Sequence, residues 1–157
     1  MGISYDVGFP LVYALMSRKT EQAYNALFMY IKTIEPTWQP QTIMMDFERA
    51  SINAIRSQFP RTRIVGCWFH SSQSLWRKIQ ELGLTRLYKI NRKVYDFFRM
   101  AMAIALLPPE NAREGFMELE IFFQNNIYNT VEPDISLKFF QFLHYFNKTW
   151  LTGNLIM

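Results

Sequence analysis

Two short runs of sequence decide the fold expected of this chain: Thr42-Ile43-Met44-Met45-Asp46-Phe47-Glu48-Arg49-Ala50 and Val65-Gly66-Cys67-Trp68-Phe69-His70. The first is a β-prone run that ends in an aspartate, and a helical pattern starts directly after it. The second is another strand-like run, and it ends in a Cys-x-x-His pair. In an open α/β sheet, ligands and metals bind at the carboxyl ends of the strands. The sequence therefore places Asp46 and the pair formed by Cys67 and His70 where chemistry could occur.

Strands and helices alternate around these two runs. We expect strands over residues 9–16, 42–45 and 63–69, because each stretch is short and apolar and is bounded by polar or turn-forming residues. Helices are indicated between them, the first capped by Thr20 and the second ended by Pro60. This alternation is the signature of a parallel sheet with right-handed crossover connections. The expected fold class is therefore α/β, with three recognisable strands.

The chain after His70 is expected to be helical throughout. Apolar residues recur there at helical spacing in four stretches, with a break near Gly83 and a new start at Pro109. The periodic positions are Leu75, Ile79 and Leu82; Val94, Phe97, Phe98, Ala101, Met102 and Ala105; Phe116, Leu119, Phe123 and Ile127; and Phe139, Phe142, Leu143, Phe146 and Trp150. A three-stranded sheet is thin for an independent α/β domain, because each face needs cover and each edge needs protection.

Composition indicates an ordinary globular chain. Its 157 residues are half hydrophobic and 17% aromatic, which suits a single packed core. No apolar run is long enough for a membrane span, and no secretory signal is expected at the N-terminus. The one cysteine excludes an internal disulfide and fits a reducing compartment, the nucleus or the cytosol.

Positive charge is concentrated in the middle of the chain. Residues 61–99 contain nine Lys and Arg against Glu81 and Asp96, a local excess of seven positive charges within a total of +4. Such a stretch is a plausible footprint for a nucleic-acid backbone, although a solvated helical face has the same composition. The candidate nucleic-acid-binding residues are Arg77, Lys78, Arg86, Lys89, Arg92 and Lys93.

Asp46 has two interpretations on its own. A strand-end aspartate is a hard oxygen ligand suited to Mg²⁺ or Mn²⁺, which usually needs further carboxylates. Aspartate is also among the preferred helix caps, and Asp46 could cap a helix that starts at Phe47. Glu48 would then lie in the first helical turn, where the helix dipole favours an acid.

The Cys67 and His70 pair has the spacing of zinc ligands, but a zinc site needs two more. His144 is the only other histidine and there is no second cysteine, so a zinc site within the chain is not expected. The alternative is a buried cysteine and a histidine bonded to a backbone carbonyl. A Cys–His nucleophilic pair lacks an orienting Asn or Asp. Four tryptophans could stack on nucleic-acid bases or fill the core: Trp38, Trp68, Trp76 and Trp150.

Taken together and in order, these pieces resemble the transposase domain of Mutator-like elements (MULE). The resemblance rests on the apolar run at residues 9–16, the helix with Tyr24, the run from Ile43 to Ala50, and the Gly66-Cys67-Trp68-Phe69-His70 motif. Asn53-Ala54-Ile55 and Phe59-Pro60 fall at matching intervals between them. Farther along, Leu106-Leu107-Pro108-Pro109 and Tyr145-Phe146-Asn147-Lys148-Thr149-Trp150 look like the helical insertion of that family.

The resemblance implies a ribonuclease H-like fold of the DDE class. In that class two aspartates and a glutamate hold two Mg²⁺ or Mn²⁺ ions, which support DNA nicking and strand transfer during transposition. By position, Asp46 looks like the second aspartate and a metal ligand, and Cys67 and His70 match the Cys-x-x-His signature of the family. Residues 1–70 would be a partial ribonuclease H-like core and residues 71–157 the helical insertion. DNA as partner, the nucleus as compartment and an oligomer with other transposase subunits follow from the same resemblance.

The chain departs from the family pattern at the other two acids. The first aspartate is expected in a strand before Phe9, and Asp6 does not stand in a matching motif. The glutamate is expected after the Trp150 region, and the acids of the insertion (Glu114, Glu118 and Glu120) are poor substitutes. With one of three acids, we expect a fragment that is inactive alone. The alternative is a domesticated, non-catalytic module that binds DNA or protein.

Overall fold

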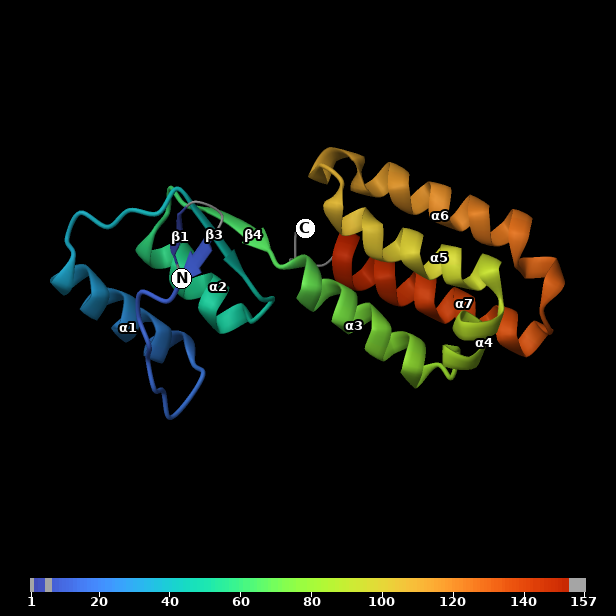
Figure 1. Ribbon diagram of the computed structural model, residues 1–157, viewed down its shortest axis with the longest axis horizontal. Coiled ribbons are helices and arrows are strands. Elements are labelled where there is room, and N and C mark those ends of the chain that lie inside the picture. Colours follow the sequence, from blue (N-terminus) through green and yellow to red (C-terminus); the bar gives the residue numbers. More distant parts are fainter. Residues whose placement is uncertain (1, 5–6, 153–157) are drawn as a thin grey trace. The chain divides into compact units, whose positions relative to one another are not determined.

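The computed structural model describes residues 2–4 and 7–152 (Figure 1). The chain forms two compact units, the first made of Met1–Ile43 with Glu48–Ile64 and the second of Met44–Phe47 with Val65–Met157. The expected α/β class is confirmed, and most of the residues are helical. The assignment of residues 1–70 to a transposase core and 71–157 to an insertion stays a prediction.

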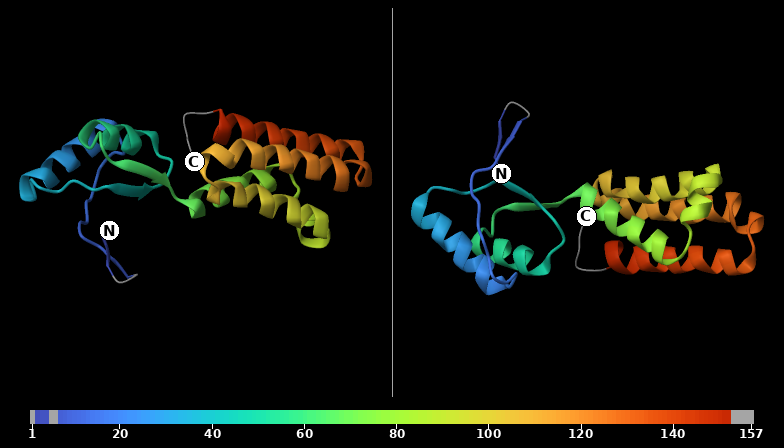
Figure 2. Two further views of the ribbon diagram at one scale, coloured as in Figure 1. Left: turned by 90° about the horizontal axis from the view of Figure 1, so that it is seen from above. Right: turned by 60° about the horizontal axis from the view of Figure 1, so that its bottom comes forward.

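The first unit is built on two helices that lie side by side, α1 (Glu21–Ile34) and α2 (Arg49–Gln58) (Figures 1 and 2). Thr20 caps α1 as expected, since its hydroxyl accepts a hydrogen bond from the amide of Ala23 at 3.3 Å. The fully buried Phe59 is the centre of this small core. The rings of Phe28 and Trp38 meet it edge-on at 5.8 and 5.0 Å.

Strands β3 (Thr42–Met45) and β4 (Arg63–Gly66) form a two-stranded sheet within the described residues. Two backbone hydrogen bonds of 2.9 Å join the strands, one from Arg63 N to Gln41 O and one from Cys67 N to Met45 O. The residue numbers increase in the same direction along both strands, with a constant offset. The pairing is therefore parallel. The strand at residues 42–45 lies where the sequence predicts it, but the strand predicted over 63–69 ends at Gly66.

The prediction was wrong at the end of β4 because Trp68 and Phe69 belong to the next helix, α3 (Trp68–Glu81). A short apolar run has the same hydrophobicity in a strand and in a helix, so periodicity cannot separate the two. Here the indole N–H of Trp68 donates to the carbonyl of Met102 at 3.0 Å. This hydrogen bond holds the first turn of α3 against the helices that follow.

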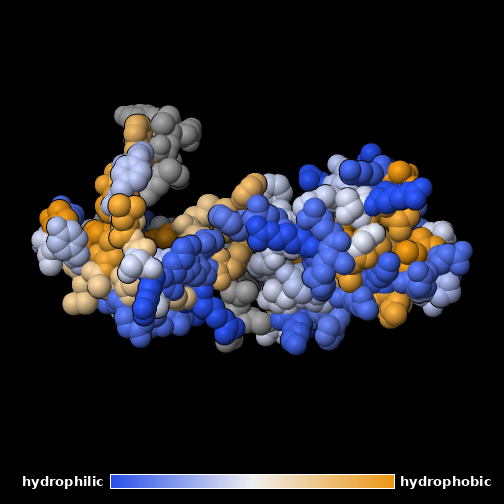
Figure 3. All heavy atoms as spheres, turned by 90° about the horizontal axis from the view of Figure 1, so that it is seen from below, coloured by the Kyte–Doolittle hydropathy of each residue, from blue (hydrophilic) through white to orange (hydrophobic). Residues whose placement is uncertain are grey.

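The strand predicted over residues 9–16 is also wrong, and a three-stranded ribonuclease H-like sheet is not confirmed. Strands β1 (Gly2–Ser4) and β2 (Val7–Phe9) pair with each other in an antiparallel hairpin, and residues 10–19 are neither strand nor helix. Figure 3 shows exposed apolar residues, in orange, on the first unit. Leu15 is fully exposed at 105% and Tyr13 is 86% exposed. Apolar composition predicts a buried strand only where a partner strand and a cover exist, and the described residues supply neither.

The second unit is a helical bundle with an aromatic core (Figure 1). Its α-helices after α3 are α4 (Thr85–Ile90), α5 (Arg92–Ala103), α6 (Ala112–Asn126) and α7 (Pro133–Phe146), joined by short 3₁₀ turns and followed by a π-helical turn, η4 (Asn147–Leu151). Phe97 of α5 lies at the centre of this core, fully buried. Its ring centroid is within 6.0 Å of four other rings, those of Phe98, Phe123, Phe139 and Phe142.

Local sequence signals explain where these helices begin and end. Gly83, at φ +70°, follows α3 in a conformation that favours glycine. The Asn91 side chain accepts hydrogen bonds from the amides of Lys93 and Val94, at 2.9 and 3.2 Å, and so caps α5. Pro109 begins a 3₁₀ turn and Pro133 begins α7. At the first position of a helix the N–H has no partner within the helix, so its absence in proline causes little loss of stability. In the part of the chain that the structure describes, no helix has the length and apolarity to cross a membrane.

Amide exchange distinguishes the two kinds of segment directly. We expect the amides of residues 11–16 to exchange close to their intrinsic rate, because they belong to no hydrogen-bonded element. The amides of α5 around Phe97 and Phe98 should exchange slowest. Slow exchange throughout residues 11–16, measured by NMR or mass spectrometry on the full chain, would contradict this fold and indicate a third strand.

Candidate functional site at the strand ends

Asp46 and Cys67 lie at neighbouring carboxyl ends of the β3–β4 sheet. Asp46 directly follows β3 and Cys67 directly follows β4. The hydrogen bond from Cys67 N to Met45 O joins the two strand ends at 2.9 Å. The parallel pairing thus brings together two residues that the sequence predicts as functional.

His70 lies near this point, one turn into α3, but it is exposed. Its ring packs edge-on against Phe69, with 5.7 Å between the ring centroids. Cys67 is half-buried and is the N-cap residue of α3, where its carbonyl accepts from the amide of Ser71 at 3.1 Å. The Cys-x-x-His motif therefore marks the passage from strand to helix in this structure.

The helix-cap interpretation of Asp46 is wrong. Helix α2 begins at Arg49 and its N-cap residue is Glu48, so Asp46 stands two residues before the cap. Glu48 itself is held within the first unit, where its Oε2 accepts from the Tyr24 hydroxyl at 3.0 Å and lies 3.6 Å from the Lys19 ammonium. Asp46 is half-buried, in the short connection between the end of β3 and the start of α2.

Phe47 fixes the end of β3 against the helical bundle. Its ring meets the buried indole of Trp150 edge-on, with 4.7 Å between the centroids. On another side the ring lies over Gly66, so close that a β-carbon there would stand 2.6 Å from two ring atoms. Gly66 is therefore required for the close approach of Phe47, and the two together set the position of the neighbouring Asp46.

The described residues do not form the two-metal site that the resemblance implies. Within residues 2–4 and 7–152, no three Asp, Glu, His or Cys side chains come together in a group that could hold an ion. Mg²⁺ requires near-octahedral oxygen ligation, and the single carboxylate of Asp46 falls short of it. Asp6 lies outside the described residues. Glu114, Glu118 and Glu120, which lie in the region predicted to be the insertion, are exposed on α6 and join no such group.

The candidate nucleic-acid-binding residues lie on α3, α4 and α5 and differ in their availability. Among the described ion pairs, Lys78 is held by Glu81 at 2.7 Å and Arg92 by Asp96 at 2.9 Å. The other four candidates are exposed and take part in none of these ion pairs: Arg77, Arg86, Lys89 and Lys93.

Aromatic side chains near these cations are used mainly for packing. Tyr88 of α4 contacts Trp76 of α3 and Tyr95 of α5, each with 5.0 Å between ring centroids. Burial raises the pKa of Tyr88, the neighbouring Tyr95 raises it further, and the positive charge of Arg99 opposes the shift. Trp38 and Trp150 are likewise packed against other rings, whereas Trp68 is partly exposed. The sequence did not single out Tyr88, because α4 has only six residues and no apolar period to mark its inner face.

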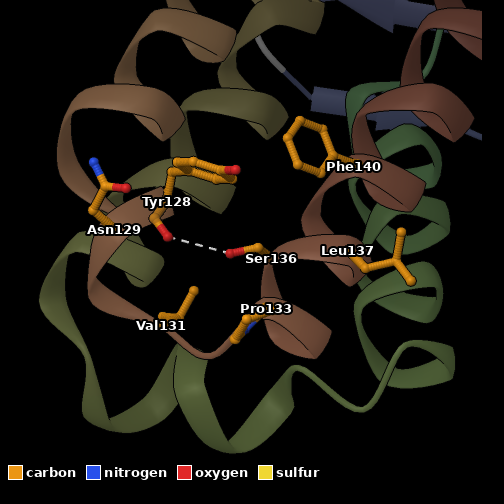
Figure 4. Close-up of a pocket in the computed structure, with 7 residues that line it drawn as sticks. All are labelled: Tyr128, Asn129, Val131, Pro133, Ser136, Leu137 and Phe140. Carbon is orange, nitrogen blue, oxygen red and sulfur yellow. Dashed lines mark hydrogen bonds between the residues drawn. The ribbon is translucent and has the colours of Figure 1, made fainter.

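A shallow apolar pocket lies on the second unit, and none of the candidate site residues lines it (Figure 4). Its volume is about 380 Å³, and the Ser136 hydroxyl donates to the Tyr128 carbonyl at 3.3 Å on its wall. It is lined by Tyr128, Asn129, Val131, Pro133, Ser136, Leu137 and Phe140. Because the lining holds no carboxylate, imidazole, thiol or ammonium group, the pocket suits an apolar side chain and has no group for acid–base chemistry.

The contact of Phe47 with Gly66 can be tested by a double-mutant cycle. Gly66→Ala should destabilise the chain by about 1–3 kcal/mol, because the new methyl group displaces a ring that is held by Trp150. In a Phe47→Ala background the same substitution should cost little. Urea denaturation of the four proteins measures both values, and an equal cost in the two backgrounds would show that the ring does not constrain Gly66.

The strand-end region lies within a segment that is similar to a known protein family. Residues 4–74 match the family model described as the MULE transposase domain. No curated protein and no solved structure matches the chain. The matched segment contains Asp46, Cys67 and His70, and it ends within α3. The resemblance seen in the sequence is thereby confirmed for this segment, which is similar to a truncated MULE transposase domain.

Proposed function

We propose that this chain is a piece of a MULE-type transposase whose parent activity is metal-dependent nicking and transfer of DNA strands. The observation that supports this is the position of Asp46 within the family match, at the carboxyl end of β3 and beside the end of β4. Strand ends of this kind are where α/β folds place their chemistry. The parent DDE site would be nuclear, with Mg²⁺ or Mn²⁺ as its ions.

In this proposal Asp46 is a catalytic carboxylate of the parent site and one of its metal ligands. The Phe47 ring, packed on Gly66 and Trp150, holds the strand end in place. Because one carboxylate binds Mg²⁺ weakly, we propose that the chain does not cut DNA by itself. Its own contribution is to bind and position DNA.

DNA binding by the helical bundle is the function that the exposed cations favour. Arg86 and Lys89 lie on α4, and Lys93 lies in the first turn of α5, close to them in the chain. Contacts of Lys and Arg with phosphates release counterions, so such binding weakens steeply as salt rises. A domesticated module without catalysis would use the same surface, and this is the alternative function that we retain.

The binding surface can be tested by neutralising two cations in the full chain. Arg86→Gln with Lys89→Gln should weaken binding to duplex DNA and lower the slope of log K against log salt by about two phosphate contacts. The matched control is Arg49→Gln with Arg56→Gln, which changes the net charge equally on the exposed surface of α2.

Fluorescence anisotropy over a range of salt concentrations measures both pairs of variants. The proposal requires the α4 pair to lose clearly more affinity than the α2 pair. Equal losses would indicate a net-charge effect without a defined surface. Absence of salt-dependent DNA binding in the unmodified chain would instead favour the protein-binding form of the alternative.

A further inference from the structure

The apolar pocket of Figure 4 is built from one continuous stretch of the helical bundle, and we call it the α7 pocket. Its lining comes from the 3₁₀ turn η3 (Tyr128–Thr130), the connection after this turn and the first two turns of α7. Three of its large side chains are exposed: Tyr128 at 41%, Leu137 at 58% and Phe140 at 42%. Exposed apolar surface with a polar border is typical of sites where proteins associate.

The aromatic wall of the α7 pocket is held in place by the core of the bundle. The rings of Tyr128 and Phe140 meet edge-on, with 5.9 Å between their centroids. Each of the two also meets the fully buried ring of Phe123 edge-on, at 5.9 Å for Tyr128 and 5.3 Å for Phe140. Because the core already fixes this wall, a ligand that binds there does not have to order it first.

The interior of the α7 pocket suits one large apolar side chain. Ser136 is buried on its wall, and its hydroxyl already donates a hydrogen bond to the Tyr128 carbonyl. A polar ligand group buried against this wall would therefore lack a hydrogen-bond partner, which is unfavourable. The volume of about 380 Å³ lies at the small end of the range for ligand pockets, so a single phenylalanine or leucine side chain suits it better than a large cofactor.

Two acids border the α7 pocket at the start of its helix. Glu132 and Asp134 stand on either side of Pro133, which lines the pocket, and both are exposed. Among the described residues neither acid takes part in an ion pair, and the Glu132 side chain makes no cap hydrogen bond to α7. Lys138 lies one turn farther along α7, but its Nζ is 4.0 Å from the point where a β-carbon on Gly83 would stand, at the end of α3. The border of the pocket therefore complements a cationic ligand.

We infer that the α7 pocket binds a short segment of a different protein, in which one phenylalanine- or leucine-sized side chain is flanked by lysine or arginine. The apolar side chain fills the pocket beside Leu137, and the flanking cations lie against Glu132 and Asp134. None of the four exposed cations proposed to contact DNA lines this pocket. Peptide binding here therefore does not depend on the DNA binding proposed above.

Titration of the full chain with a short synthetic peptide tests this site. The probe is acetyl-Gly-Lys-Phe-Lys-Gly-amide, and two-dimensional NMR spectra of the ¹⁵N-labelled chain at low salt follow its binding. A contact of this size is weak, so we expect a dissociation constant of about 1 mM, with the largest shifts in the amides of residues 128–140. One control peptide replaces phenylalanine with alanine, and the other replaces both lysines with glutamate. Each control should bind about tenfold more weakly or less.

Leu137→Ala tests the apolar part of the site. This substitution removes an exposed part of the lining and should raise the dissociation constant of the probe by about fivefold. The matched control is Met117→Ala, which shortens a side chain of α6 that is 56% exposed and lies outside the pocket, and it should leave binding unchanged. The spectrum of each free variant shows whether its fold is intact.

Neutralisation of the border tests the charged part of the site. Glu132→Gln with Asp134→Asn should raise the dissociation constant by about threefold or more at low salt. The matched control, Glu114→Gln with Glu118→Gln, removes the same charge from the exposed surface of α6 and should have little effect. Equal losses in the two pairs would overturn the role of Glu132 and Asp134, because they would indicate a response to net charge alone.

Three further results would overturn the inference. The first is the absence of shifts in residues 128–140 at a probe concentration of about 10 mM. The second is equal binding of the probe and either control peptide, which would mean that the site does not recognise an apolar side chain next to cations. The third is the same set of shifts when the chain is concentrated without peptide, which would make a second copy the occupant.

Peptide binding and DNA binding can be separated with variants already described. Arg86→Gln with Lys89→Gln should bind the probe as the unmodified chain does, and Leu137→Ala should keep its DNA affinity. Loss of DNA binding in the first variant with retained peptide binding supports two separate sites. Loss of peptide binding in that variant would overturn the assignment of the peptide to the α7 pocket.

Discussion

The contact on which the candidate site depends is the packing of the Phe47 ring between Gly66 and Trp150. A two-stranded parallel sheet has little stability of its own, and among the described residues β3 and β4 pair only with each other. Here the ends of both strands are held by the aromatic core of the helical bundle, through a ring only one residue from Asp46. The helical half of the chain thus fixes the position of Asp46, although Phe47 and Trp150 lie far apart in the sequence.

The helical part of this fold could be predicted from the sequence because its signals are local. Asn91 caps α5, Pro109 and Pro133 mark starts, and the period of the phenylalanines gives the buried faces. The errors lie where local sequence needed a distant partner. Residues 10–16 have strand composition, but the described part of the chain supplies no partner strand for them, and Asp46 resembles a cap although the helix starts at Arg49. Register and helix start depend on tertiary packing, which a single sequence does not display.

For the candidate site, the sequence predicted that two strand ends come together, but it did not predict how the basic side chains are paired. Asp46 and Cys67 do lie at adjacent strand ends, since parallel pairing brings those ends together. The separate roles of the six basic residues could not be predicted, because the pairing of Lys78 and Arg92 with local acids depends on side-chain geometry. Four exposed cations remain, three of them around α4 and the start of α5.

The central proposal is that this chain, whose residues 4–74 match the MULE transposase domain, binds DNA through its helical bundle and does not cut it. The most direct measurement is binding and nicking of supercoiled DNA by the purified chain, with Mg²⁺, with Mn²⁺ and with EDTA, for the unmodified protein and Asp46→Asn. The account predicts that DNA is bound equally under all conditions and by both proteins, and that none of it is nicked. Metal-dependent nicking by the unmodified chain that disappears in Asp46→Asn would contradict the account, because it would require a complete catalytic site.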